Sequence, residues 1–156
     1  ANLSLYITQA AANDQPQHQL DLQFGDSIFL EGYSLGTDTL APGDTLILTL
    51  FWKTNATLDR RYTVFTHLIG SNGALQAQRD SEPRGGSLPT DQWPVNQRIA
   101  DNYAMLLPED IPAGNYLLNV GMYQLTTGER LTVYTESSEA SQKDYVTLKT
   151  VKIEHP

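Results

Sequence analysis

The chain of 156 residues contains no cysteine, which excludes disulfide bonds, a thiolate nucleophile and cysteine-ligated zinc. It has no apolar run long enough to cross a bilayer, and no signal peptide opens the sequence. We therefore expect that this segment does not insert into a membrane by itself. Because the chain starts with Ala1 and not with methionine, we expect a mature or excised part of a longer protein.

Positive charge is also scarce, with 10 lysine and arginine residues against 18 aspartate and glutamate residues and a net charge of -8. An acidic surface repels phosphate backbones, so we expect no nucleic-acid partner. Hydrophobic residues make up 40% of the sequence, which is typical of a globular protein. This length suits one domain, and because no linker or internal repeat is visible, we assign residues 1–156 to a single domain.

Helical patterns are missing as well, and at most residues 108–114 (PEDIPAG) form one helical turn. Apolar residues instead alternate with polar ones, which places one row of side chains in a core. Turn signals rich in glycine and proline separate the runs, at 41–44, 70–73, 112–115 and 126–129. The alternating residues are Leu3, Leu5 and Ile7; Leu20, Leu22 and Phe24; Leu46, Leu48, Leu50 and Trp52; Tyr62, Val64, Thr66 and Leu68; Ile99, Tyr103, Met105 and Leu107; Tyr116, Leu118, Val120 and Met122; Leu131 and Val133; Val146, Leu148, Val151 and Ile153.

This alternation predicts an all-β fold, an antiparallel β-sandwich of the immunoglobulin or jelly-roll type with about nine or ten strands and little or no helix. A barrel is the less favoured arrangement. The acidic, serine-rich segment 135–144 (TESSEASQKD) is predicted to be a mobile surface loop.

One short motif fits a serine hydrolase. Residues 32–36 (GYSLG) match the G-x-S-x-G pattern of a nucleophile elbow. An elbow needs a strand, a tight turn at the serine and then a helix, whereas Pro42 and Gly43 prevent a helix of useful length here. We therefore interpret Gly32 as a bulge and Gly36 as a turn in β-structure, and Ser34 as no nucleophile.

A longer pattern covers residues 20–153 in order. It resembles the β-sandwich domains at the extracytoplasmic C-terminal end of bacterial polytopic membrane proteins that look like family 39 (dolichyl-phosphate-mannose-type) glycosyltransferases. Its specificity lies in a combination of six features: Trp52, His67, Asp80, Trp93, Asp101 and the tripeptide GMY at 121–123. The main segments are FGDSIFLEGYSL (24–35), APGDTLILTLFWK (41–53), RYTVFTHLIGSNGALQAQRDSEP (61–83), LPTDQW (88–93) and IADNYAMLLPEDIPAGNYLLNVGMYQLTTGERL (99–131).

The chain departs from that family at one point. The family pattern continues past the second tryptophan with Pro-Gly-Glu, where this chain has Pro94-Val95-Asn96-Gln97, so a carboxylate role does not carry over there. The resemblance implies a place in the cell envelope as part of a membrane-anchored protein. It implies no activity of the sandwich domain itself.

The segment 78–103 is the most unusual part of the chain, because a long connection with three prolines lies between two predicted strands. Its carboxylates offer oxygen ligands for calcium, although no D-x-D-x-D-G spacing is present. Aspartates at strand ends also cap turns by accepting backbone N–H bonds. We favour turn capping and no cofactor, with calcium as the alternative. The candidate metal ligands are Asp80, Glu82, Asp91 and Asp101.

Trp93 has two interpretations. An exposed indole beside Asp91, with Tyr103 nearby, suits stacking on a sugar ring and hydrogen bonds to hydroxyl groups. A tryptophan is usually mostly buried, so we favour an indole that closes one end of the core. His67 has no second ligand nearby in the sequence, and we interpret it as a hydrogen-bonded structural histidine.

These observations favour a non-catalytic, extracytoplasmic β-sandwich that serves as an accessory or interaction domain of a larger glycosyltransferase-like membrane protein. Its expected partners are the rest of that protein or components of the cell envelope. The alternative is a carbohydrate-binding module, with or without calcium, that binds a glycan through Trp93, Asp91 and Tyr103 in the 78–103 loop. No nucleophile, base and orienting group can be named as a set, so we do not expect an enzyme.

Overall fold

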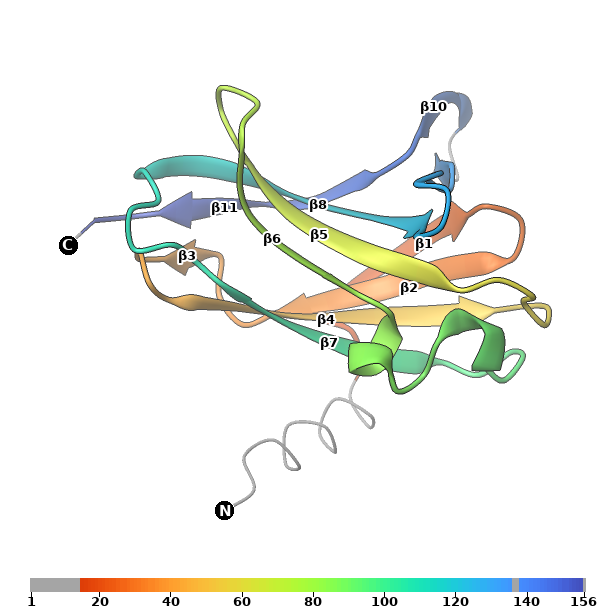
Figure 1. Ribbon diagram of the computed structural model, residues 1–156. Helices are drawn as coiled ribbons and strands as arrows, with labels where there is room; N and C mark the ends of the chain where they lie inside the picture. The colour runs from red at the N-terminus through yellow and green to blue at the C-terminus, as the bar shows by residue number, and fades with distance from the viewer. Residues whose placement is uncertain (1–14, 136–137, 156) are drawn as a thin grey trace, which may run out of the picture.

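The computed structural model describes residues 15–135 and 138–155, with the side chains of 138–142 left out. The predicted N-terminal strand with Leu3, Leu5 and Ile7 lies outside the described residues. The described residues form two stacked β-sheets (Figure 1). The all-β sandwich predicted from the alternation is thereby confirmed.

The first sheet has six strands in the order β10-β9-β1-β2-β4-β7, and the second has five in the order β3-β11-β8-β5-β6. Neighbouring strands are antiparallel, except that β3 pairs in parallel with β11. The strands are β1 (His18–Phe24), β2 (Ile28–Leu35), β3 (Thr39–Leu40), β4 (Thr45–Thr54), β5 (Tyr62–Gly70), β6 (Leu75–Ser81), β7 (Ile99–Leu106), β8 (Gly114–Gln124), β9 (Val133–Thr135), β10 (Ser138–Lys143) and β11 (Val146–Ile153).

The core lies between the two sheets and is built from alternate residues of their strands. Leu46, Leu48, Leu50 and Trp52 of β4 are all buried, and they face the buried residues of β8, which begin with Tyr116. This is the row that the alternation predicted, because successive side chains of a strand point to opposite faces.

Two segments differ from the prediction. Residues 108–114 form a turn without helix, whereas two short 3-10 helices occur in the β6–β7 connection, η1 (Pro83–Gly86) and η2 (Thr90–Gln92). The segment 135–144 was predicted to be a loop, but it contains β10, which pairs with β9. Both differences have one cause: tertiary pairing and packing override weak local signals.

Two phenylalanines on the outward faces of the sheets are buried as deeply as core residues. Phe65 of β5 is 1% exposed, because the Arg130 guanidinium lies 4.3 Å from its ring centroid. Phe51 of β4 lies in the same way under Arg98, at 5.9 Å. The flat guanidinium shields the ring from water and adds a cation–π attraction.

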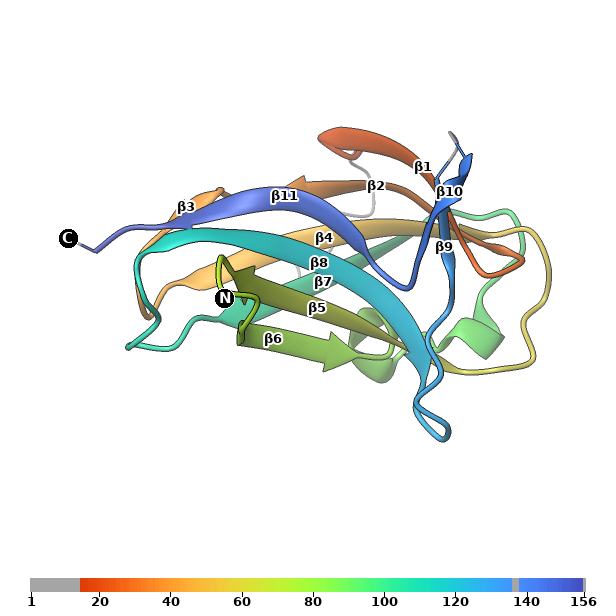
Figure 2. The ribbon, with the colours of Figure 1, turned by 90° about the horizontal axis from the view of Figure 1, so that it is seen from above.

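Four connections gather at one end of the sandwich, which we call the loop end: residues 25–27, 55–61, 82–98 and 125–132. Figure 1 shows the first three on the right of the molecule, and Figure 2 shows the last one, between β8 and β9, at the same end. Connections on a rigid sandwich are the usual location of binding residues. No helix in the described part of the chain has the length and apolar character needed to span a membrane.

Candidate functional site

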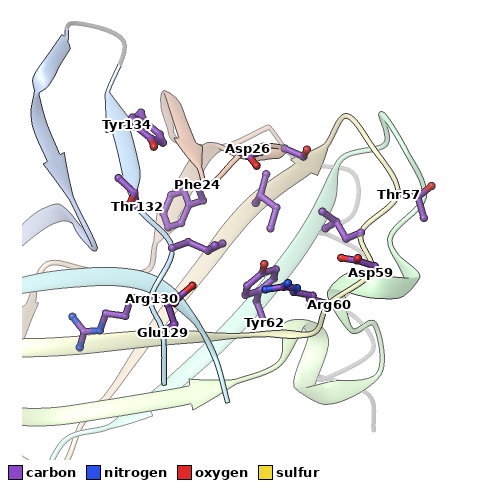
Figure 3. A pocket seen from close by; sticks show the side chains of 15 residues that line it. Phe24, Asp26, Thr57, Asp59, Arg60, Tyr62, Glu129, Arg130, Thr132 and Tyr134 are labelled. Carbon is purple, nitrogen blue, oxygen red and sulfur yellow. The ribbon is translucent and has the colours of Figure 1, made fainter. Parts of the chain in front are cut away.

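A cavity of about 540 Å³ opens at the loop end. Its walls come from three separate stretches, residues 24–28, 57–62 and 129–134 (Figure 3). Cavities of roughly 300–1,000 Å³ are typical of small-molecule sites. The size and position make this cavity the candidate binding site.

The floor of the cavity is apolar because strand alternation continues to the ends of β1 and β2. Phe24 and Ile28 are buried, and Leu58 and Leu131 pack against the same core. Gly25 has a φ of +62°, a conformation that glycine adopts without strain. Its N–H donates a 2.8 Å bond to the Thr132 carbonyl, which ties the β1–β2 turn to the segment before β9 and closes this wall.

The rim carries the polar groups. Asp26, Asp59 and Glu129 supply carboxylates, and Tyr62 and Tyr134 supply aromatic rings with hydroxyl groups. Within the described residues, these five side chains have no hydrogen-bond or ion-pair partner. Polar groups without a protein partner at the mouth of a concave site are available to a ligand.

The two arginines of the cavity wall behave differently. Arg130 points away from the cavity, since its guanidinium lies over Phe65 and 3.4 Å from an Asp144 oxygen. Arg60 lies beside Tyr62 on the cavity wall (Figure 3) and has one long contact of 3.5 Å to Gln124. Arg60 is therefore the guanidinium of this wall that remains open to a ligand.

Asp101, a predicted candidate metal ligand, is fully buried and serves as an acceptor. Its Oδ2 accepts bonds from Trp52 Nε1 at 3.2 Å and from Tyr103 Oη at 2.6 Å, and its Oδ1 accepts one of 2.7 Å from the Arg84 N–H. Burial raises the pKa of Asp101 to about 6, against the effect of these three bonds, which stabilise the ionised form. The carboxyl group fastens η1 to the first sheet.

The other candidate metal ligands lie apart and have different partners. Asp80 accepts a 3.0 Å bond from the Tyr123 hydroxyl, whereas Glu82 forms a two-bond ion pair with Arg61 at 2.8 and 2.6 Å. That pair lowers the pKa of Glu82. Asp91 is exposed. Across residues 15–135 and 138–155, no group of three or more histidine, aspartate or glutamate residues is placed to hold a metal ion.

The sugar-binding alternative needs a correction, because its two aromatic residues are buried. Trp93 is 4% exposed, donates a 3.0 Å bond from Nε1 to the Leu88 carbonyl and packs beside Trp52. Tyr103 is buried in the same core, and burial together with Asp101 raises its pKa far above the ordinary 10. Neither ring is open to a sugar, so this set does not form an open site; Asp91 alone of the three is exposed.

The neighbours of Ser34 and His67 indicate a structural role for both residues. Ser34 lies within β2, where its Oγ accepts a 3.0 Å bond from the Gln17 N–H. The register of β2 shifts just before Gly32, which is the bulge that the sequence suggested. His67 packs against Phe65, and burial lowers its pKa despite an Asp80 oxygen 3.8 Å away.

Sequence reasoning missed the cavity because its residues come from three ordinary short connections. The 78–103 segment has a more unusual sequence, since it is long and rich in proline. One signal was present: charged residues 59–61 directly precede Tyr62, the first residue of β5.

No protein-family model matches the sequence, and no curated protein matches it. Several solved structures are similar to the chain. The chain is similar to the C-terminal domain of wzt, with a TM-score of 0.54, 10% identity and coverage of 90% of this chain and 82% of that chain. A CARDB domain of the PF1109 protein from Pyrococcus furiosus gives a TM-score of 0.43 at 11% identity, covering 89% and 97%. A Niemann-Pick type C2 protein from the Japanese carpenter ant gives 0.46 at 7% identity, covering 90% and 98%. The similarity to the C-terminal domain of wzt, at 10% identity, extends to the fold alone, a β-sandwich.

Proposed function

We propose that this chain is a non-catalytic accessory domain of a larger, glycosyltransferase-like membrane protein on the extracytoplasmic side, and that the loop-end cavity binds a ligand or another envelope component. The observation that carries the proposal is the cavity itself, at the end of a two-sheet core, whose rim holds carboxylates and tyrosines that have no partner among the described residues. A rigid sandwich that presents binding residues on its connections needs no chemistry of its own.

The non-catalytic part of the proposal is supported by the partners of the perturbed groups. The pKa values of Asp101, Glu82 and His67 are shifted, and each shift has a structural cause: burial in the core, the ion pair with Arg61, and burial beside Phe65. A catalytic site requires a nucleophile or general base directed at a shared reacting position. In the described residues these three groups belong to separate clusters and do not share a reacting position.

A nuclear magnetic resonance titration of the isotope-labelled chain tests the proposal. Glycans, lipid vesicles and peptides from cell envelopes are added in turn, and backbone shifts are mapped while the added component is checked for chemical change. We expect shifts confined to residues 24–28, 57–62 and 129–134, with no product formed. Shifts at the opposite end, around 70–73 and 112–116, or turnover of any component, would refute the proposal.

Carbohydrate binding is a second candidate function, and one observation favours it. Tyr62 and Tyr134 border the same cavity as the carboxylates of Asp26, Asp59 and Glu129. Tyrosine rings pack against the C–H faces of sugars, and carboxylates accept hydrogen bonds from hydroxyl groups. The carbohydrate-binding alternative therefore has this cavity, and not the 78–103 loop, as its proposed site.

A further inference from the structure

A second cavity, of about 460 Å³, lies beside the first. Asp59 and Arg60 border both of them. The second cavity continues over Arg61, Glu82 and the exposed Leu125. The two cavities thus meet at a two-residue ridge formed by Asp59 and Arg60.

The position of the ridge is determined by the residues at the start of β5. Successive residues of a strand point to opposite faces, so Tyr62 faces the first cavity while Arg61 and Thr63 face the second. Asp59 and Arg60 precede the strand and lie at the point where its two faces meet. A ligand that occupies both cavities must pass over these two side chains.

Among the described residues that line the two cavities, one arginine has no ion-pair partner. The Arg61 guanidinium is held by two bonds to Glu82, and the Arg130 guanidinium by Asp144 and the Phe65 ring. The Arg60 guanidinium, by contrast, has only the 3.5 Å contact to Gln124 within the described part of the chain. The ridge therefore offers one strong donor among several carboxylate acceptors.

We infer that the two cavities form one site for an extended, neutral oligosaccharide of several sugar units, with Arg60 as the residue that binds the unit at the ridge. This inference rests on the proposed function and names the ligand class and length of its site. A neutral sugar chain supplies donors to Asp26, Asp59 and Glu129, acceptors to Arg60, and C–H surfaces to Tyr62 and Leu125.

Other ligand classes fit less well. An anionic polymer is repelled by the net charge of -8 and by Asp26, Asp59 and Glu129, which have no ion-pair partner among the described residues. A basic peptide that spans both cavities is repelled by the guanidinium of Arg60, whose charge no ion pair among the described residues neutralises. A lipid chain would lie against the charged and hydroxyl groups of the rim, whose desolvation is costly.

The test is an array of neutral and acidic oligosaccharides of one to eight sugar units, with an oligolysine peptide as a further probe. Calorimetric titration then follows the neutral series that binds. We expect affinity to rise with length through at least three units. Arg60→Gln should weaken the longer oligomers at least about tenfold.

Arg79→Gln is the matched control, because Arg79 is an exposed arginine of β6 that borders neither cavity; it should leave all affinities unchanged. The inference is overturned if affinity does not depend on length, if acidic oligomers or oligolysine bind best, or if no array member binds. A single sugar bound without length dependence would overturn the two-cavity site and leave the accessory-domain proposal intact.

Discussion

Asp101 shows how much one buried carboxyl group can organise. Its donors come from β4, from β7 and from η1, so it joins the first sheet to the connection that follows β6. A buried acceptor with several donors is costly to alter, because each donor that loses its partner remains desolvated. The position of the 82–98 connection therefore depends on this residue.

The raised pKa of Asp101 predicts a specific dependence of stability on pH. The pKa of Asp101 is about 6 in the folded protein, above the ordinary 3.8. The folded protein therefore binds the carboxyl proton of Asp101 more tightly than the unfolded chain does. The contribution of Asp101 is fully present below about pH 4 and is lost as the pH rises through 6, by on the order of 3 kcal/mol. Urea unfolding at several pH values, followed by tryptophan fluorescence, measures this change.

Asp101→Asn is the control for that prediction, since Glu82 and His67 titrate equally in both proteins. The unfolding free energy of the wild type minus that of the variant should fall between pH 4 and pH 7. At pH 4 the variant should also be less stable than the wild type, by about 1–3 kcal/mol, because an amide nitrogen accepts no bond and one donor stays unpaired. A difference that is constant or rises with pH would contradict the assignment.

Trp93→Ala should cost about 3–5 kcal/mol of unfolding free energy. The indole is buried beside Trp52, and its removal leaves a cavity and an unpaired Leu88 carbonyl. Trp93→Phe keeps most of the packing and should cost less. Denaturant unfolding of both variants checks the order. An alanine variant as stable as the wild type would show that the ring contributes little to the core.

The packing of strand β8 depends on the absence of a side chain at Gly121. A Cβ there would overlap the ring of Phe65 and lie 2.9 Å from the Asp144 carbonyl oxygen. We expect Gly121→Ala to lower the unfolding free energy by about 1–3 kcal/mol through overpacking. Gly36→Ala is the control, since its nearest neighbour is an ordinary 3.5 Å away, and it should change stability by less than about 0.5 kcal/mol. Equal melting temperatures for the two variants would refute this account.

The strands themselves were predictable, because alternation reports directly on a face that is buried. The inward rows of β4, β7 and β8 follow the predicted pattern, as Leu48, Met105 and Leu118 show. The buried outward rings of Phe51 and Phe65 were not predictable from alternation. They are covered by Arg98 and Arg130, which come from distant connections, and a local pattern holds no information on such partners.

The candidate cavity was not predictable from the sequence, because the candidate site residues that the sequence singled out do not line it. The sequence drew attention to Asp101 and Trp93, and both are central to the fold, but their role follows from donors and neighbours that only the tertiary structure brings together. The cavity forms only when residues from three connections come together in the folded chain. Apart from the charged residues 59–61, nothing local in the segments 24–28, 57–62 or 129–134 indicates that these segments meet.

The molecule as a whole should keep its stability without divalent metal. Asp80, Glu82 and Asp101 are engaged by separate protein partners, so a chelator has no ion to remove from them. We expect the same melting temperature with EDTA and with calcium. A ligand specific for the folded state raises stability by about 2.7 kcal/mol at a hundredfold excess over Kd. A calcium-induced rise that Asp80→Asn abolishes would contradict this prediction.

The order of strands in the two sheets also determines how quickly the chain finds its fold. β1 pairs with β9 and β3 with β11, and the Tyr33 hydroxyl bonds the Leu148 carbonyl 115 positions away. Loops of this length must close before these contacts stabilise anything, which gives sandwich proteins folding times of milliseconds to seconds. Stopped-flow refolding should fall in that range, and complete refolding within microseconds would contradict it. During that interval the edges of β1 and β11 have not yet met their partners, so refolding at high concentration should lose yield to strand pairing between chains.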